Sequence, residues 1–141
     1  MKIFLLFFFV CLAFQSYSQA IETTIKQASA FDHKKIYKSD SVDQKAIFPG
    51  GEKLLYKFLY ENIHYPADAR EKKKSGNVEA IFVVEQDGSV SSPRILRGVW
   101  PSIDAEVMRL LLLLPSGWTP AEKDGIPVRS EFLLPVRFFL Q

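Results

Sequence analysis

An ordered series of turn and breaker signals constrains the fold of this chain more than any other feature of its sequence. The signals are Tyr65-Pro66, Gly76, Asp87-Gly88 and Trp118-Thr119-Pro120. The segments between them keep either the 3.6-residue period of a helix or the two-residue period of a strand. The signals therefore predict one compact domain whose helices and strands begin and end at known places.

Two amphipathic helices are predicted, over residues 52–63 and 101–114, because apolar side chains recur there at helical spacing. Pro66 suits the first turn of a shorter helix over residues 67–74, since its missing N–H is not needed there. Gly76 ends that helix. The helical content of the domain is thus two main helices and one short one.

Three strands are predicted, over residues 78–85, 90–96 and 128–140. Asp87-Gly88 predicts a hairpin between the first two, because both residues tolerate positive φ. Pro93 in the second strand predicts a bulge or an edge position. The last strand alternates most cleanly, and its predicted inward residues are Val128, Phe132, Leu134, Val136, Phe138 and Leu140. The order of elements, with a hairpin at its centre, predicts an α+β fold with helices on one face of an antiparallel sheet.

The first 20 residues have the pattern of a cleaved signal peptide. Lys2 precedes an apolar run over residues 3–14, which is too short for a typical transmembrane helix of roughly 20 apolar residues. The alternative is an uncleaved segment that anchors the chain in the inner membrane. Residues 21–45 are a polar lead-in that we expect to be partly disordered, and the domain proper is expected over 46–141. The signal predicts export to the periplasm.

No set of residues in the sequence points to catalysis or to a cofactor. Cys11, the only cysteine, lies in the expected signal peptide. The histidines, His33 and His64, have no further ligands at metal-binding spacing. The net charge of +2 is small, which argues against nucleic acid as a partner, because such binding calls for a concentrated basic face. We therefore expect no enzyme, no cofactor, no metal site and no nucleic-acid binding.

The landmarks resemble the C-terminal domain of the TonB family, the energy transducers of Gram-negative envelopes. The resemblance rests on Tyr65-Pro66 before Ala69-Arg70, Ser75-Gly76-Asn77-Val78, Asp87-Gly88 and Trp118-Thr119-Pro120. Phe48-Pro49-Gly50-Gly51 and Leu134-Pro135-Val136 are similar to the branch of the family common in Bacteroidetes-type envelopes. The resemblance covers roughly residues 46–140.

The resemblance implies a sheet of about three antiparallel strands with two main helices packed on one face. It also implies a role linked to transmembrane transport, in which the extended TonB-box peptide of an outer-membrane receptor adds a strand beside residues 128–140. The partner-binding residues that it implies are Tyr65, Pro66, Arg70, Val128, Arg129, Ser130, Glu131, Phe132 and Leu133. Pro135 lacks an N–H and limits how far an added strand can pair.

The chain departs from a full transducer, because the sequence shows no persuasive anchor and no long proline-rich span. We therefore expect a stand-alone binding module that competes for receptors. The alternative is an envelope protein that binds peptidoglycan or forms a homodimer through its last strand. Two landmarks also have structural explanations: the Tyr65 ring can pack on the core at a helix start, and Trp118 is more often a core residue than a contact.

Overall fold

The computed structural model describes residues 17–23, 25–26 and 34–140, and the chain divides into two units at residues 33 and 34. In the first unit, residues 17–23 and 25–26 are helical. Most of the predicted signal peptide lies outside the described residues. Within the parts of the chain that are described, no helix has the length and apolar character needed to cross a membrane.

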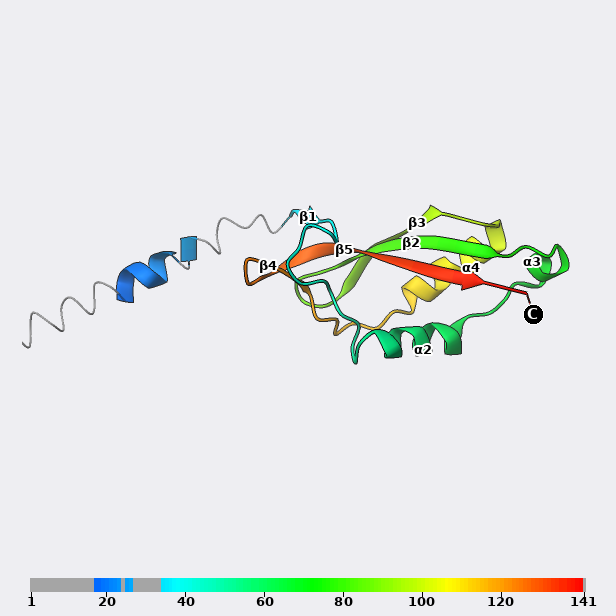
Figure 1. The fold of residues 1–141 in the computed structure, drawn as a ribbon, viewed down its shortest axis with the longest axis horizontal. Helices are drawn as coiled ribbons and strands as arrows, with labels where there is room; N and C mark the ends of the chain where they lie inside the picture. Colours follow the sequence, from blue (N-terminus) through cyan, green and yellow to red (C-terminus); the bar gives the residue numbers. More distant parts are fainter. Residues whose placement is uncertain (1–16, 24, 27–33, 141) are drawn as a thin grey trace, which may run out of the picture. The chain divides into compact units, whose positions relative to one another are not determined.

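The second unit is built on a sheet in the strand order β1-β5-β2-β3 (Figure 1). The strands are β1 (Ile36–Tyr37), β2 (Gly76–Val84), β3 (Val90–Arg97), β4 (Ala121–Lys123) and β5 (Ile126–Phe138). The strands β3, β2 and β5 are antiparallel neighbours, whereas the short β1 runs parallel to β5. The short β4 forms a hairpin with the start of β5. The α+β prediction is confirmed, and its three antiparallel strands form the body of the sheet.

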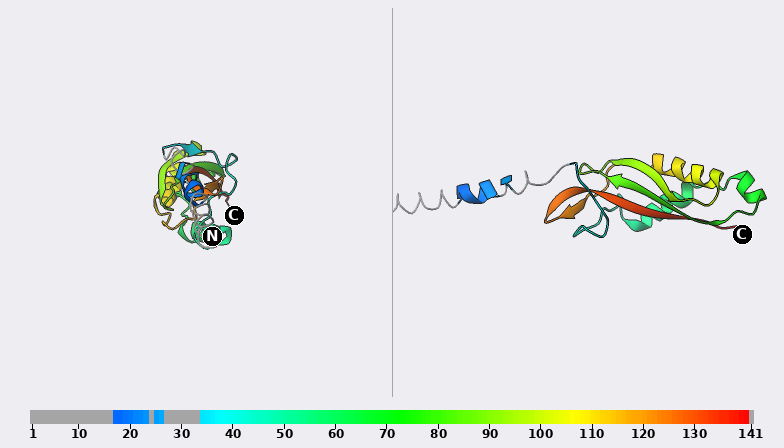
Figure 2. Two further views of the ribbon diagram at one scale, coloured as in Figure 1. Left: turned by 90° about the vertical axis from the view of Figure 1, so that its left-hand side faces the viewer. Right: turned by 90° about the horizontal axis from the view of Figure 1, so that it is seen from above.

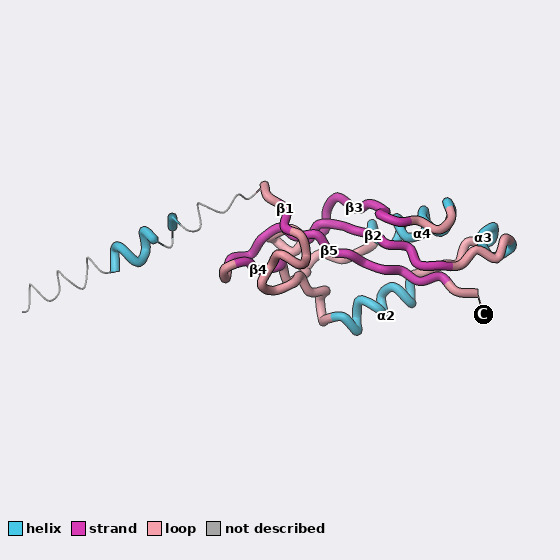
Figure 3. The backbone as a smooth tube through the Cα atoms, turned by 45° about the horizontal axis from the view of Figure 1, so that its top comes forward, coloured by secondary structure: helices cyan, strands magenta, loops and turns pink. Residues whose placement is uncertain are grey.

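The helices are α2 (Glu52–Asn62), α3 (Ala67–Glu71) and α4 (Pro101–Leu112). The view from above shows α4 running along the sheet (Figure 2), and the tube view shows α2 beside β5 (Figure 3). The predicted apolar stripe of α4 is buried at Ile103, Val107, Leu110 and Leu111. In α2 only Leu55 and Leu59 are buried, so this helix packs less deeply than α4.

An aromatic cluster around Trp118 holds the core together at one end of the sheet. The Trp118 ring lies edge-on to Phe48, Phe82 and Phe132, with centroids 5.0 to 5.3 Å apart. Its indole N–H donates to the carbonyl of Pro115 at 3.0 Å, which satisfies the one polar atom of the side chain. Trp118 is therefore a core residue, as its type suggested, and it joins the segment before α2 to both central strands.

The lead-in differs from expectation, because residues 34–45 belong to the folded unit. Ile36 and Tyr37 pair with β5, and Gln44 forms a bridge to Glu122. A strand of two residues has no detectable period, so the sequence could not show it. The fold thus begins about twelve residues before the predicted start at Ala46.

The last strand also differs from the prediction, since it covers Ile126–Phe138 rather than 128–140. Leu140 was predicted to face inward, but that is wrong, because 37% of it is exposed. The ladder ends where Phe138 pairs with Gly76, the first residue of β2, so Leu140 lies beyond the paired part of the strand. The bulge predicted at Pro93 is confirmed by a register shift in the β2–β3 ladder and by the positive φ of Ser92, 50°.

We predict that Gly88→Ala destabilises the domain more than Gly125→Ala does. A Cβ at Gly88, where φ is +81°, would lie 2.4 Å from the carbonyl oxygen of Trp118, whereas a Cβ at Gly125, where φ is +73°, meets no atom within 4 Å. Backbone strain is common to both, at about 1 kcal/mol, and the clash adds roughly 2 kcal/mol at Gly88 alone. Urea unfolding of both variants measures the difference. Equal losses of stability would contradict the close approach.

Candidate functional site

One edge of β5 is paired along its whole second half, and the other edge is open there. On the paired side, Ser130 to Phe138 match Val84 to Gly76 in nine residue pairs without a register shift. On the other side, β1 pairs with Arg129 and Ser130. No described strand pairs with that side from Glu131 to Phe138. We call residues 131–138 of β5 the open edge, because their outward N–H and C=O groups are free for another strand.

Of the six predicted binding residues that belong to β5, three lie on the open edge and three do not. Glu131, Phe132 and Leu133 are at its beginning. Val128 is buried and pairs with Ala121 of β4, while Arg129 and Ser130 pair with β1. In this structure the chain's own short strands therefore occupy the positions at which the sequence predicted a partner.

The other three predicted residues lie at the far end of β5. The Tyr65 ring packs edge-on against Phe138 at 5.5 Å, and its hydroxyl donates to the carbonyl of Lys74. The guanidinium of exposed Arg70 is 5.8 Å from the centre of that ring. Pro66 precedes α3 and is half-buried. Leu133 and Phe138 are five residues apart, about 17 Å along a strand, so the nine predicted residues do not form one cluster.

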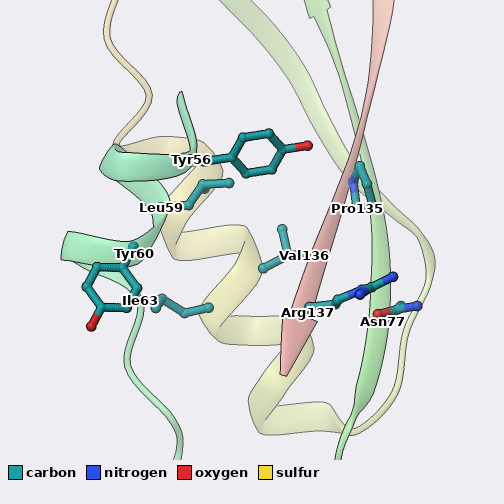
Figure 4. A pocket seen from close by; sticks show the side chains of 8 residues that line it. All are labelled: Tyr56, Leu59, Tyr60, Ile63, Asn77, Pro135, Val136 and Arg137. Atoms are coloured by element: carbon teal, nitrogen blue, oxygen red, sulfur yellow. The ribbon is translucent and has the colours of Figure 1, made fainter. Parts of the chain in front are cut away.

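A groove runs between α2 and the open edge, and we call it the α2–β5 groove. It consists of two hollows of about 480 and 440 Å³. The first is lined by Tyr56, Leu59, Tyr60, Ile63, Asn77, Pro135, Val136 and Arg137. The second is lined by residues 45–48, Glu52, Leu55, Tyr56 and residues 132–135. Tyr56 and Pro135 line both hollows, and Figure 4 shows the Tyr56 side chain directed from α2 toward Pro135.

Sequence reasoning did not include α2 in the site. A signal was present, because Tyr56 and Tyr60 are four residues apart and therefore share one side of the helix. Both tyrosines are exposed, at 51% and 84%. Large aromatic side chains that remain exposed on a helix next to an unpaired strand are typical of a contact surface.

Contacts at the middle and at the end of α2 fix its position beside the open edge. In the middle of the helix, the ring of Phe58 lies 6.0 Å from that of Phe48, which belongs to the Trp118 cluster. At its end, the Arg109 side chain of α4 donates to the carbonyl of Asn62 at 2.6 Å, and the amide of His64 donates to Glu106 at 2.7 Å. The width of the groove is therefore set by contacts of α2 with the aromatic core and with α4.

Ion pairs link strands of the sheet on the face opposite to that of Phe82 and Leu134. Arg129 bridges to Glu85 at 2.5 Å, and Arg94 bridges to Glu131 at 2.8 Å. The hydrogen bonds from Arg129 hold the pKa of Glu85 below that of an ordinary glutamate. Arg137 on the open edge has no acidic partner among the described residues. A positive charge is thus left at the end of the groove.

No grouping of three or more histidine, cysteine, aspartate or glutamate side chains suited to a metal ion occurs in the described part of the chain. What the arrangement offers is an interaction surface: hydrogen-bonding groups on one strand edge, and an apolar groove beside them.

Comparison with known proteins gave one family and a similar solved structure. Residues 61–140, more than half of the chain, match the family model described as Gram-negative bacterial TonB protein C-terminal. The solution structure of the Helicobacter pylori TonB C-terminal domain is similar, with a TM-score of 0.48 and 17% identity over 63% of this chain and 78% of that one. None of the curated proteins matches the chain.

We predict that Glu106→Gln weakens the attachment of α2 in a pH-dependent way. Arg109 donates to both carboxylate oxygens of Glu106 and holds the pKa of that glutamate below its ordinary range. A lowered pKa stabilises the fold above the unfolded value of about 4.3, and this stabilisation is lost as the pH falls through the folded value.

The free energies of unfolding of the wild type and of Glu106→Gln should therefore differ by about 1 kcal/mol at pH 7 and converge as the pH falls from about 4.3 through the lowered folded pKa of Glu106. Glu61→Gln is the matched control, because its pair with Lys57 is long, at 3.7 Å, and exposed. A difference that stays constant down to low pH would contradict this role for Glu106.

We predict that Ser130→Ala does not destabilise the domain. The Ser130 hydroxyl is buried and has no hydrogen-bond partner among the described residues. Removing an unsatisfied buried hydroxyl should leave stability unchanged or raise it by about 1 kcal/mol. Ser89→Ala is the control that should lose stability, because the Ser89 hydroxyl donates to Asp87 at 2.6 Å. Thermal unfolding compares the two, and a clear loss at Ser130 would reveal a bound water or another hidden partner.

Proposed function

The chain belongs to the family of Gram-negative bacterial TonB protein C-terminal domains, and on that premise we propose that it binds extended receptor peptides at the open edge of β5. The family is one of protein-interaction modules of the cell envelope rather than of enzymes. The proposed partner is the TonB-box peptide of a TonB-dependent outer-membrane receptor, added as a further strand. The observation that carries the proposal is the unpaired side of β5 from Glu131 to Phe138.

The regularity of β5 supports this choice of edge. Its ladder with β2 has no register shift, so its outward groups form an even row. The sheet's other outer strand, β3, carries a bulge next to Pro93. Bulges are devices that protect an edge from pairing. A partner strand therefore finds a better template on β5 than on β3.

Pro135 indicates which groups of β5 face a partner. Proline is tolerated in a sheet where its nitrogen points away from the paired strand. Because Pro135 lies opposite Glu79 of β2, we infer that its nitrogen is on the open side. The N–H groups of Glu131, Leu133 and Arg137 then share that side, since alternate residues of a strand face the same neighbour. An added strand can accept hydrogen bonds from these N–H groups, but not from Pro135, which has no N–H.

The place of action that we propose is the periplasm, on the basis of the export signal over residues 1–20. There the domain would compete with a transducer for receptor segments and so modulate transport across the outer membrane. Its role is binding, with no reaction catalysed. Self-association through the same edge, or binding to peptidoglycan, is the alternative that the experiment below separates.

We predict that receptor TonB-box peptides shift the amide signals of residues 131–138 in NMR titration of the full chain and leave β3 unchanged. Leu133→Pro should weaken binding tenfold or more, corresponding to about 1.4 kcal/mol, because it removes one outward N–H. The domain should tolerate this change, because the backbone nitrogen of Leu133, like that of Pro135, is on the open side of β5 and makes no bond to β2. Leu133→Ala keeps the N–H and is the matched control, because it separates the loss of the side chain from the loss of the N–H.

Three outcomes would contradict the proposal. The first is the absence of shifts on β5 at millimolar peptide. The second is equal binding by Leu133→Pro and Leu133→Ala. The third is a stable dimer in sedimentation whose interface covers the open edge and which does not bind peptides. That result would support self-association instead.

A further inference from the structure

We propose that the α2–β5 groove selects its partner by accepting two apolar side chains at alternate positions of the added strand, with a carboxylate next to Arg137. The inference rests on the proposed function, because a strand on the open edge is what brings side chains to the groove. It assigns a role in specificity to α2, and above all to Tyr56.

Both hollows have apolar side chains from α2 and from β5. One is closed by Leu55, Phe132 and Leu134, and the other by Leu59 and Val136. Their volumes, about 480 and 440 Å³, leave ample room for one aliphatic side chain in each. Water in such hollows has few polar partners, so its replacement by an apolar side chain is favourable.

The position of the hollows along β5 sets the spacing of the side chains. One hollow lies against residues 132–135 and the other against residues 135–137, so they meet at Pro135. In an added strand, side chains on the helix side recur every second residue, about 6.7 Å apart. Two such side chains fall on either side of Pro135. Neighbouring residues of the partner cannot do the same, because one of them points away from α2.

Tyr56 divides the groove. Its side chain extends from α2 toward Pro135, and it lines both hollows (Figure 4). About half of the side chain is exposed, which leaves ring surface for a partner to cover. A tyrosine that gains contact on both faces without a change of rotamer is a typical source of binding energy at low entropic cost.

Charge indicates the orientation of the partner. Lys45 and Glu52 line the same hollow and offset each other, whereas Arg137 is the only charged residue that lines the other. Arg137 makes no ion pair within the described residues. A partner segment with a carboxylate at this end, and apolar residues toward the middle, therefore complements the groove.

Three synthetic peptides test the inference with the full chain. All are threonine-based, have nine residues and carry one aspartate at the same end. The first has two leucines separated by one residue, the second has the same two leucines adjacent, and the third has none. We expect the spaced peptide to bind about tenfold more tightly than the adjacent one, because a second leucine is buried.

Substitutions on the protein complete the test. Tyr56→Ala should reduce the preference for the spaced peptide to about twofold, because truncating an aromatic residue at a contact centre removes most of its contribution. Leu54→Ala should keep the preference, since Leu54 is exposed on the same helix and lines neither hollow. Arg137→Glu should weaken binding of the aspartate peptides about threefold at low salt and less at high salt.

The outcomes separate this inference from the proposed function. Equal binding of all three peptides, with amide shifts on residues 131–138, would overturn the selection by the groove and leave strand addition intact. No binding of any peptide, receptor TonB-box peptides included, would overturn both. A spaced-peptide preference that survives Tyr56→Ala would overturn the role of Tyr56.

Discussion

The antiparallel ladder between β2 and β5 is the interaction on which the rest of the structure depends. Its nine consecutive pairs fix which side chains of β5 face the core and which backbone groups face outward. Because the register does not shift, Val128, Leu134, Val136 and Phe138 all lie on the buried side. The same ladder occupies one edge of β5 from Ser130 to Phe138, while on the other edge β1 pairs only with Arg129 and Ser130. From Glu131 onward that edge is left for a partner.

The sequence could predict the parts of the fold that have a clear period or a turn signal. The stripe of α4, the hairpin at Asp87-Gly88, the bulge near Pro93 and the core position of Trp118 all follow from residue types and spacing. The sequence also predicted the family, because the same turn signals carry the resemblance. The match to the family model confirms it. Each of these features depends on neighbours in the sequence.

The candidate site depends on contacts between distant segments, and the sequence could predict it only in part. The strand β1 has two residues, so nothing in the sequence indicated that it would cover Arg129 and Ser130. Tyr65 and Arg70 were grouped with the start of β5, but the direction of the strand puts them next to Phe138. The groove beside α2 arises because Phe48 contacts the middle of the helix and Arg109 its end, which no local pattern of α2 reveals.

The central claim is that β5 has one paired edge and one open edge from Glu131 to Phe138. Amide hydrogen exchange at single-residue resolution tests it most directly in the free protein. The account predicts slow exchange at Phe132, Leu134 and Val136, whose N–H groups face β2, and fast exchange at Leu133 and Arg137. Uniform protection along the strand in the free protein would contradict the open edge, and with it the surface on which the proposed binding depends.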